Sequence, residues 1–134
     1  MSQILVVDDD QRYLKRLVDA SQASGAQITT AVSGDEAIRN IQSQDFDVVV
    51  TDLAMETPDA GLEVLRAAKD KDKFTQVILI THMGTKAISV LAMSLGAYDY
   101  IEKRSRKTDS LAKLRIQVGK ALEYRELKLA ARSA

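Results

Sequence analysis

The sequence predicts an α/β fold in which a parallel five-stranded sheet carries helices on both faces. Two observations lead to this prediction. Short apolar runs rich in β-branched residues alternate with segments of helical periodicity along the whole chain. The first run, at residues 4–7, is continuously apolar, as is typical of a strand covered on both faces. Five strand-then-helix units in succession favour a parallel sheet, because each strand returns to the sheet through a helix.

The first two units have clear boundaries. The strand at 4–7 precedes a helix with an exit at Gly25, and a second strand is expected at 28–32. Ser33 and Glu36 then form the pattern of a capping box, with Ser as the N-cap and Glu at N3, so a second helix should begin there. The apolar residues at helical spacing are Leu14, Leu17 and Val18 in the first helix and Ala37, Ile38 and Ile41 in the second, where they should face inward.

Three more strands follow, at 46–51, 77–81 and 98–101. The loop after the third strand holds Pro58, the only proline of the chain. The helix before the fifth strand should end at Gly96, because glycine commonly terminates helices. The two helices in this region are identified by Leu62, Leu65 and Ala68, which should face inward, and by Ile88, Leu91 and Leu95.

The last helix should run from about Thr108 to about Ala130. One face of it carries Leu111, Leu114, Val118 and Leu122. The helix continues past the point where the core of one domain needs it. We therefore expect a single domain over residues 1–122 and a C-terminal extension over 123–134, which acts either as a linker or as a dimer contact.

Length and composition restrict the class of protein. A chain of 134 residues corresponds to one domain, since a typical domain has about 150 residues. Hydrophobic residues make up 46% and charged residues 28%, which is an ordinary globular balance. The chain has no cysteine, so disulfides and thiolate metal sites are excluded. No apolar run approaches the roughly 20 residues of a membrane span. We expect a cytoplasmic protein that does not bind membranes.

Charge is distributed unevenly along the chain. Residues 1–102 hold 9 Lys and Arg against 16 Asp and Glu, a net charge of −7, whereas residues 103–134 hold 10 against 3, a net charge of +7. The basic segment is either a solvated helix face or a docking surface for an acidic partner or nucleic acid. It contains one aromatic residue, Tyr124, and no DNA-reading motif. We therefore expect no direct binding of nucleic acid by this domain.

Polar residues follow four of the predicted strands at the point where each strand ends. In a sheet of this class, the ligand site lies at the carboxyl ends of the strands. The residues placed there are Asp8, Asp9 and Asp10 after the first strand, Asp52 after the third, Thr81 and His82 after the fourth, and Lys103 after the fifth. Asp10 is interpreted as the N-cap of the first helix. The others should converge on one edge of the sheet.

These residue types favour phosphoryl chemistry. Clustered carboxylates repel one another unless a cation lies among them, and Mg²⁺ is a hard cation that binds carboxylates and phosphate oxygens. Asp52 can then act as a nucleophile on phosphorus and form an aspartyl phosphate. Lys103 can supply a positive charge to one phosphoryl oxygen and Thr81 a hydroxyl donor to another. Together these groups would make a minimal phosphoryl-accepting site.

Five segments of the chain resemble the response-regulator receiver domain of two-component signalling. They are Ile-Leu-Val-Val-Asp-Asp at 4–9, Asp-Val-Val-Val-Thr-Asp-Leu at 47–53, Gly-Leu-Glu-Val-Leu at 61–65, Val-Ile-Leu-Ile-Thr at 77–81 and Gly-Ala-Tyr-Asp-Tyr-Ile-Glu-Lys at 96–103. The resemblance covers about residues 3–122. It implies a flavodoxin-like, doubly wound (βα)5 fold with strand order 2-1-3-4-5.

The resemblance also implies residue roles. Asp52 would be the phosphoacceptor for the phosphohistidine of a histidine kinase, and Thr81 and Lys103 would hold phosphate oxygens. Tyr100 would be the aromatic switch residue that changes rotamer as Thr81 moves toward the phosphate. The Mg²⁺ ligands would be Asp8, Asp9, Asp52 and the backbone carbonyl of Ala54. The protein would not be a dedicated enzyme, since it would catalyse only its own phosphorylation and dephosphorylation.

The implied output is a reshaped surface formed by the fourth helix, the fifth strand and the fifth helix. Phosphorylation would move Thr81 and the loop that follows it inward, and this would bias the surface between two states. The output is either homodimerisation through this surface or release of an output domain, which is appended or separate.

The chain departs from the family pattern at several positions near the site. Gly61 lies nine residues after Asp52, one more than usual, and the longer loop carries Glu56, which is either solvated or in contact with the metal through water. His82 replaces a small residue and either covers the phosphoryl group partly or faces solvent. Arg104 stands where the family has a cis proline, so the turn is expected to be trans or distorted.

Two alternative functions remain at this stage. The first is a pseudo-receiver, a binding module that is never phosphorylated; its usual mark, loss of the acceptor or the lysine, is missing because Asp52 and Lys103 are both present. The second is a phosphatase like the haloacid dehalogenases, which also use an Asp nucleophile, Mg²⁺, a hydroxyl residue and a lysine. Against it, 134 residues leave no room for a cap domain, and the late metal-binding acid pair is missing.

Overall fold

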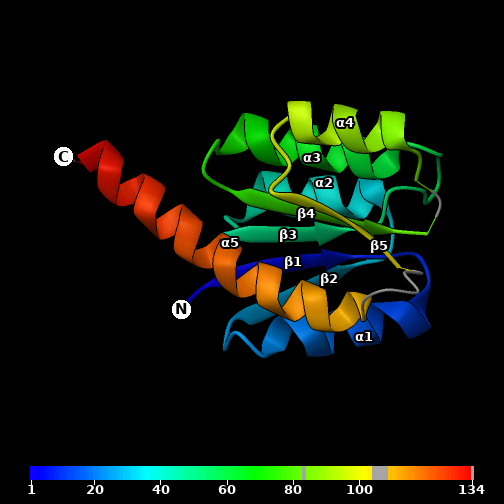
Figure 1. Ribbon diagram of the computed structural model, residues 1–134, viewed down its shortest axis with the longest axis horizontal. Coiled ribbons are helices and arrows are strands. Elements are labelled where there is room, and N and C mark those ends of the chain that lie inside the picture. Colours follow the sequence, from blue (N-terminus) through cyan, green and yellow to red (C-terminus); the bar gives the residue numbers. More distant parts are fainter. Residues whose placement is uncertain (83, 104–108, 134) are drawn as a thin grey trace.

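The computed structural model describes residues 1–82, 84–103 and 109–133 (Figure 1). Five parallel strands form one sheet in the order β2-β1-β3-β4-β5, so the predicted fold class and strand order are confirmed. The elements are β1 (Gln3–Val7), α1 (Gln11–Gln22), β2 (Gln27–Ala31), α2 (Gly34–Ser43), β3 (Val48–Thr51), α3 (Ala60–Lys71), β4 (Gln76–Thr81), α4 (Lys86–Ser94), β5 (Asp99–Glu102) and α5 (Ser110–Ser133).

The helices lie in two layers, with α2, α3 and α4 on one face of the sheet and α1 and α5 on the other (Figure 1). Each face has its own apolar core. In β1, Leu5 and Val7 belong to the core under α2 to α4, whereas Ile4 and Val6 belong to the core under α1 and α5. All four side chains are fully buried. This explains why the strand is continuously apolar, since both of its faces are covered.

Side chains cap the first two helices as the sequence predicts. Asp10 accepts hydrogen bonds from the backbone N–H groups of Arg12 and Tyr13, and it is therefore the N-cap of α1. Ser33 accepts from the N–H of Glu36 at the start of α2. The carboxylate of Glu36, however, accepts from the N–H of Val32 rather than from that of Ser33. The capping box is thus present with its return bond shifted by one residue.

The helices α4 and α5 add two details to the prediction. Within α4, Ala92 is buried and Ile88 and Leu95 pack partly buried against the core, whereas Leu91 is 38% exposed. The helix α5 begins at Ser110, where the Asp109 carboxylate accepts from the N–H groups of Leu111 and Ala112. The predicted start at Thr108 and the turn at Arg104 lie outside the described residues.

Polar contacts near Ser110 and at Arg125 fasten the helix α5 to the rest of the fold, and between them Gln117 donates a hydrogen bond to Asp99 (2.8 Å). At its first residue, the Ser110 hydroxyl donates to the carbonyls of Glu102 and Lys103 (2.5 and 3.0 Å). Four turns later, Arg125 binds Asp47 through Nε (2.8 Å) and Asp72 through an η nitrogen (3.0 Å). The C-terminal part of the helix then projects past the edge of the sheet (Figure 1). No helix in the described residues is both long and apolar enough to cross a membrane.

Candidate functional site

Three carboxylates meet where β1 and β3 end. Asp8 and Asp9 follow β1, and Asp52 follows β3, which pairs with β1 in parallel. Each of the three offers an oxygen atom within 4.8 Å of the others. Asp8 is fully buried and Asp52 is 4% exposed, whereas Asp9 is exposed. The carboxylate cluster, defined as Asp8, Asp9 and Asp52, therefore lies where the sequence predicted a convergent site.

Lys103 bridges the two buried carboxylates. Its Nζ lies 2.8 Å from Asp8 Oδ2 and 3.2 Å from Asp52 Oδ2. Burial alone would lower the pKa of this ammonium, but the hydrogen bonds and charges of Asp8 and Asp52 outweigh burial and raise the pKa. The aromatic ring of Tyr13 lies beneath it, with Nζ 4.2 Å from the ring centroid. Lys103 is thus held as a cation between two acids and an aromatic face.

Backbone N–H groups occupy the remaining oxygens of the two buried acids. Asp8 Oδ1 accepts from the N–H of Asp10 at 2.9 Å, and Asp52 Oδ1 accepts from the N–H of Leu53 at 2.7 Å. Burial raises the pKa of Asp8, although Lys103 and the Asp10 N–H oppose this shift. Because burial disfavours the ionised form of Asp8, a nearby cation would stabilise this carboxylate.

The donor set of the carboxylate cluster fits Mg²⁺. It consists of hard carboxylate oxygens, from two buried acids and one that faces solvent, which leaves room for water ligands. Among the described residues it contains no nitrogen or sulfur donor that would favour a softer metal. Ala54, whose carbonyl was predicted as a fourth ligand, is half-buried two residues beyond Asp52. The ligand roles of these four residues stay predictions.

Thr81 and His82 occupy different environments after β4. Thr81 is fully buried, and its carbonyl accepts from the N–H of Lys103 at 2.9 Å. The end of β4 is thereby tied to the end of β5, next to the carboxylate cluster. His82 is exposed. Of the two interpretations of His82, exposure favours the solvent-facing one.

Glu56 caps a neighbouring helix, a role that sequence reasoning did not assign. Its two carboxylate oxygens accept from the N–H groups of Gly34 (2.7 Å) and Asp35 (3.0 Å) at the start of α2. These hydrogen bonds lower the pKa of Glu56 against the opposing effect of burial. The longer acceptor loop therefore reaches across to α2 and is held there. A helix N-terminus favours a carboxylate, but no pattern in the sequence indicated which helix Glu56 would reach.

Gly61 allows α3 to begin directly against the acceptor strand. Its N–H donates to the carbonyl of Leu53 at 2.7 Å. A Cβ atom at this position would lie 2.2 Å from the carbonyl oxygen of Asp52 and 2.7 Å from Cα of Leu53. Any other residue would push α3 away from the segment that carries Asp52. Gly61 thus fixes the acceptor loop at one end while Glu56 fixes its middle.

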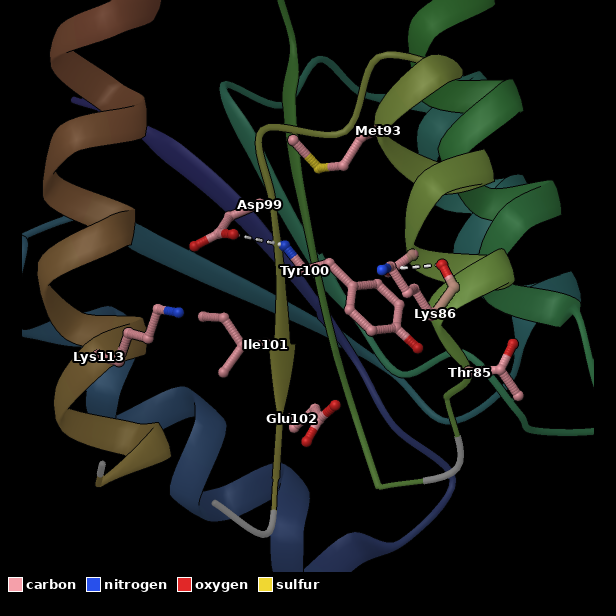
Figure 2. Close-up of a pocket in the computed structure, with 9 residues that line it drawn as sticks. Thr85, Lys86, Met93, Asp99, Tyr100, Ile101, Glu102 and Lys113 are labelled. Atoms are coloured by element: carbon pink, nitrogen blue, oxygen red, sulfur yellow. Dashed lines mark hydrogen bonds between the residues drawn. The ribbon is translucent and has the colours of Figure 1, made fainter. Parts of the chain in front are cut away.

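Tyr100, the predicted switch residue, lies in β5 and points toward α4 (Figure 2). Its side chain borders a groove of about 540 Å³ between α4, β5 and α5, which is also lined by Lys86, Glu102 and Lys113. The hydroxyl is buried and has no hydrogen-bond partner among the described residues. A Cβ at Gly84 would lie 1.4 Å from this hydroxyl, so the ring packs directly on the backbone of Gly84. The Tyr100 hydroxyl is therefore buried against Gly84, in the segment between β4 and α4.

Tyr13 is the other residue of the site that sequence reasoning missed. It lies in the first turn of α1, three residues after the N-cap Asp10, and its ring covers Lys103. Burial raises the pKa of its hydroxyl, so Tyr13 stays neutral beside the carboxylate cluster. The sequence indicates that Tyr13 lies in the first turn of a helix, but not in which direction its ring points.

Comparison with known proteins places the chain among signalling proteins. The family described as the response regulator receiver domain matches residues 4–115. The acid tolerance regulatory protein ActR of Rhizobium meliloti (strain 1021) is 34% identical over 120 residues, which are 90% of this chain and 61% of ActR. The C4-dicarboxylate transport transcriptional regulatory protein DctD of Pseudomonas aeruginosa is 34% identical over 129 residues, 96% of this chain and 27% of DctD. The chain thus spans about three-fifths of ActR and a smaller share of DctD.

Solved structures give the same result. A response regulator receiver domain protein from Clostridium thermocellum superposes with a TM-score of 0.80 at 29% identity, over 95% of this chain and 98% of that one. NtrX from Brucella abortus gives 0.83 at 27% identity, over 99% of this chain and 29% of NtrX. The beryllofluoride-activated NtrC4 receiver domain, solved as a dimer, gives 0.80 at 28% identity, over 93% of this chain and 99% of that one. The similarity includes the strands that carry the carboxylate cluster.

Proposed function

The chain belongs to the response regulator receiver domain family, and from this premise we propose that Asp52 accepts a phosphoryl group from the phosphohistidine of a histidine kinase in a Mg²⁺-dependent reaction. Receiver domains of response regulators are signalling switches rather than dedicated enzymes. The observation that carries the proposal is the meeting of Asp52 with Asp8, Asp9 and Lys103, in which Lys103 Nζ contacts both buried acids.

The proposed reaction is an in-line displacement on phosphorus. An Asp52 carboxylate oxygen attacks the phosphorus atom, and a P–O bond forms as the P–N bond to the donor histidine breaks. The electron pair of that bond stays on the imidazole nitrogen, which takes up a proton. The product is an aspartyl phosphate that stores the transferred group as a mixed anhydride. The chain itself needs only to position the reactants and neutralise the phosphoryl oxygens.

The residues around Asp52 would provide this neutralisation. Lys103 would move its ammonium from the Asp52 carboxylate to a phosphoryl oxygen, and Thr81 would donate its hydroxyl to another. Asp8, Asp9, Asp52 and the Ala54 carbonyl would hold Mg²⁺. When bound, the cation supplies positive charge to the phosphoryl oxygens that two buried carboxylates would otherwise repel. Each proposed role falls on a residue at the carboxyl end of a strand or within three residues after it.

The proposed readout is a change at the groove between α4, β5 and α5. Movement of Thr81 toward a phosphoryl group would pull the segment that contains Gly84, against which Tyr100 packs. Tyr100 would then change rotamer and alter the groove it borders. We infer a histidine kinase as the donor partner, and either a homodimer or an output domain as the recipient of the signal. Homologues such as DctD and NtrX are longer proteins, which supports an output domain.

Intact mass spectrometry tests the acceptor. The full chain is incubated with Mg²⁺ and a small-molecule phosphodonor, and one phosphoryl group should be gained. The gain should need Mg²⁺ and vanish in Asp52→Asn, while the exposed acid variant Asp19→Asn should behave like the wild type. No gain, despite Mg²⁺ binding shown by titration, would contradict the proposal. The protein would then be a phosphorylation-independent binding module.

Beryllofluoride, a tetrahedral substitute for the phosphoryl group, tests the readout. Added with Mg²⁺, it should shift the amide resonances of Tyr100 and its neighbours in α4 and β5, and Thr81→Ala should suppress these shifts. Light scattering of the same samples separates the two outputs, because only the homodimer predicts a doubled mass. Unchanged resonances at Tyr100, with beryllofluoride bound at Asp52, would contradict the switch role.

A further inference from the structure

A second groove of about 520 Å³ lies at the opposite end of the sheet from the carboxylate cluster. Its walls come from the residues just before β4 and β5, from the end of α3 and from the projecting part of α5. The residues that matter here are Lys69, Lys73, Phe74, Tyr98, Tyr124 and Lys128. We refer to it as the basic aromatic groove. It is separate from the groove beside Tyr100, with which it shares no lining residue.

Cations and aromatic rings alternate in this groove. Lys73 Nζ lies 5.3 Å from the centroid of the Phe74 ring, and Lys128 Nζ lies 5.3 Å from that of Tyr124. The guanidinium of Arg132 also lies over Phe74, at 5.2 Å. Among the described lining residues none is an Asp or Glu. The groove thus combines three lysines with no acid among its described lining residues, so its charge would attract an anion.

Lys69 shows the same shortage of negative charge. Its ammonium is fixed by hydrogen bonds to the carbonyls of Lys73 (2.6 Å) and Thr75 (2.9 Å), which use two of its three N–H groups. Burial lowers its pKa, and the charge of Arg125 adds to this effect, although Asp72 opposes both. The carboxylate of Asp72 is itself engaged by Arg125 at 3.0 Å. Lys69 is therefore a positioned cation, and Asp72, the acid whose charge acts on it, also binds Arg125.

Two tyrosine rings, whose planes are tilted by 54°, supply aromatic surface beside these cations. Tyr98 and Tyr124 pack with their ring centroids 5.6 Å apart, and Tyr124 remains 40% exposed. Aromatic faces of this kind bind planar bases by stacking, irrespective of base identity. A free phosphate would use the lysines and leave the rings unused. A ligand that uses both must carry a planar ring and an anionic group.

We propose that the basic aromatic groove binds a nucleotide, with the base against Tyr124 and the phosphate groups on Lys69, Lys73 and Lys128. The volume falls within the range of about 300–1,000 Å³ that is common for small-molecule sites. Tyr124 and Lys128 belong to α5, whereas the other residues belong to the body of the domain. A bound nucleotide would therefore also hold the projecting part of α5 against the body.

Calorimetric titration of the full chain with ATP tests the proposal. EDTA is present throughout, so that no metal–nucleotide complex can bind at the carboxylate cluster. Adenosine lacks the charge and tripolyphosphate lacks the ring, so each should bind about tenfold or more weakly than ATP. No detectable binding of ATP would overturn the proposal. Equal binding of tripolyphosphate would overturn the nucleotide assignment, since it would reveal a site for polyanions alone.

Variants separate the groove from general surface charge. Tyr124→Leu and the double variant Lys73→Gln/Lys128→Gln should each raise the Kd for ATP about tenfold or more, while Tyr124→Phe should bind like the wild type because it keeps the ring. Lys15→Gln is the matched control, since Lys15 is an exposed lysine of α1 outside the groove. Circular dichroism verifies that each variant is folded. An equal loss in Lys15→Gln, or none in the groove variants, would refute the assignment.

Discussion

Lys103 is the single residue on which the metal-free site depends most. Its ammonium is the cation that lies on the buried acids Asp8 and Asp52. Lys103→Met should lower the free energy of unfolding by about 3–5 kcal/mol in EDTA at neutral pH, because two buried charges lose their partner. Because the pKa of Lys103 is raised, the stability that its ammonium contributes is fully present below the ordinary pKa of 10.5. This stability is lost as pH rises through the folded-state pKa.

Urea denaturation measures this difference. Lys113→Met, at an exposed position on α5, serves as the control and should change stability by less than about 0.5 kcal/mol. A loss below about 1 kcal/mol in Lys103→Met would mean that Asp8 and Asp52 tolerate each other without the ammonium.

Removal of the Tyr100 hydroxyl, unlike removal of the Lys103 ammonium, should not destabilise the protein. It is buried without a hydrogen-bond partner among the described residues. Tyr100→Phe should therefore leave stability unchanged or raise it by up to about 1 kcal/mol, because an unsatisfied polar group is removed and the ring is kept. The stability change in Tyr100→Phe is compared with that in Tyr98→Phe, the same substitution at the other tyrosine of this segment. Thermal unfolding is the measurement, and a loss above about 1 kcal/mol at Tyr100 would reveal a hydrogen bond to this hydroxyl.

Most of the site could be predicted residue by residue, and there is a physical cause for the residues that could not be predicted. The carboxyl ends of parallel strands meet at one edge, so Asp8, Asp52 and Lys103 could be placed together from their positions alone. Tyr13 and Glu56 could not. The first contributes through the direction of a ring and the second through a contact with α2, and both depend on how helices pack on the sheet. Sequence periodicity gives the face of a helix but not the reach of a side chain.

At the scale of elements, Arg125 joins α5 to the loops before β3 and β4. It binds Asp47 and Asp72, and its side chain is only 14% exposed. Arg125→Ala should cost about 1–3 kcal/mol, since hydrogen bonds between charged groups are lost. Amide hydrogen exchange should also accelerate in α5 beyond this position. Arg115→Ala, on the exposed side of the same helix, should show neither effect. Equal exchange in both variants would contradict the anchoring role.

Asp72 makes this anchor dependent on pH. Burial would raise its pKa, but the Phe74 N–H and Arg125 outweigh burial and lower the pKa below 3.8. A carboxylate whose pKa is lowered contributes stability that is fully present above pH 3.8 and is lost as pH falls through the folded-state pKa. The stability gap between wild type and Asp72→Asn should therefore narrow at acid pH. Urea denaturation from about pH 6 to pH 3 measures it. Asp70→Asn, at an exposed neighbour, should show a small gap at every pH.

The elements themselves were predictable to within a few residues. Capping residues such as Asp10 and Ser33 marked helix starts, because their side chains bond N–H groups that the helix leaves free. Leu91 shows where periodicity fails. It shares its helical spacing with Ile88 and Leu95, which pack against the core, yet it is 38% exposed. How deeply a helix lies on the sheet therefore decides which of its apolar residues are buried.

At the scale of the molecule, residues 1–122 should fold without the extension. The core residues of α5, such as Leu114, Val118 and Ala121, all precede residue 122. Truncation after Leu122 removes the Arg125 anchor and the Tyr98–Tyr124 contact, so stability should fall by about 1–3 kcal/mol. A single cooperative transition in circular dichroism should remain. An unfolded product would show that the extension belongs to the domain.

The charge division of the chain also has a meaning at this scale. The basic segment after residue 102 was interpreted as either a solvated face or a docking surface. Arg125 contacts Asp47 and Asp72, so part of the charge of this segment is neutralised within the fold.

The strand order was predicted from the family resemblance, since alternation of strands and helices alone does not specify which strands are neighbours.

The two attachments of α5 have a mechanical consequence. Ser110 is bonded to the backbone of Lys103 at one end of the sheet, and Arg125 is bonded at the other. The helix between them is about 22 Å long at the usual rise per residue. Leu114, Val118 and Ala121 bury its middle in the core, so a displacement of the Lys103 backbone would act on a helix that is held along this whole length. Arg125 is the last of these contacts, and of its two acid partners Asp72 has the lowered pKa that makes the contact dependent on pH.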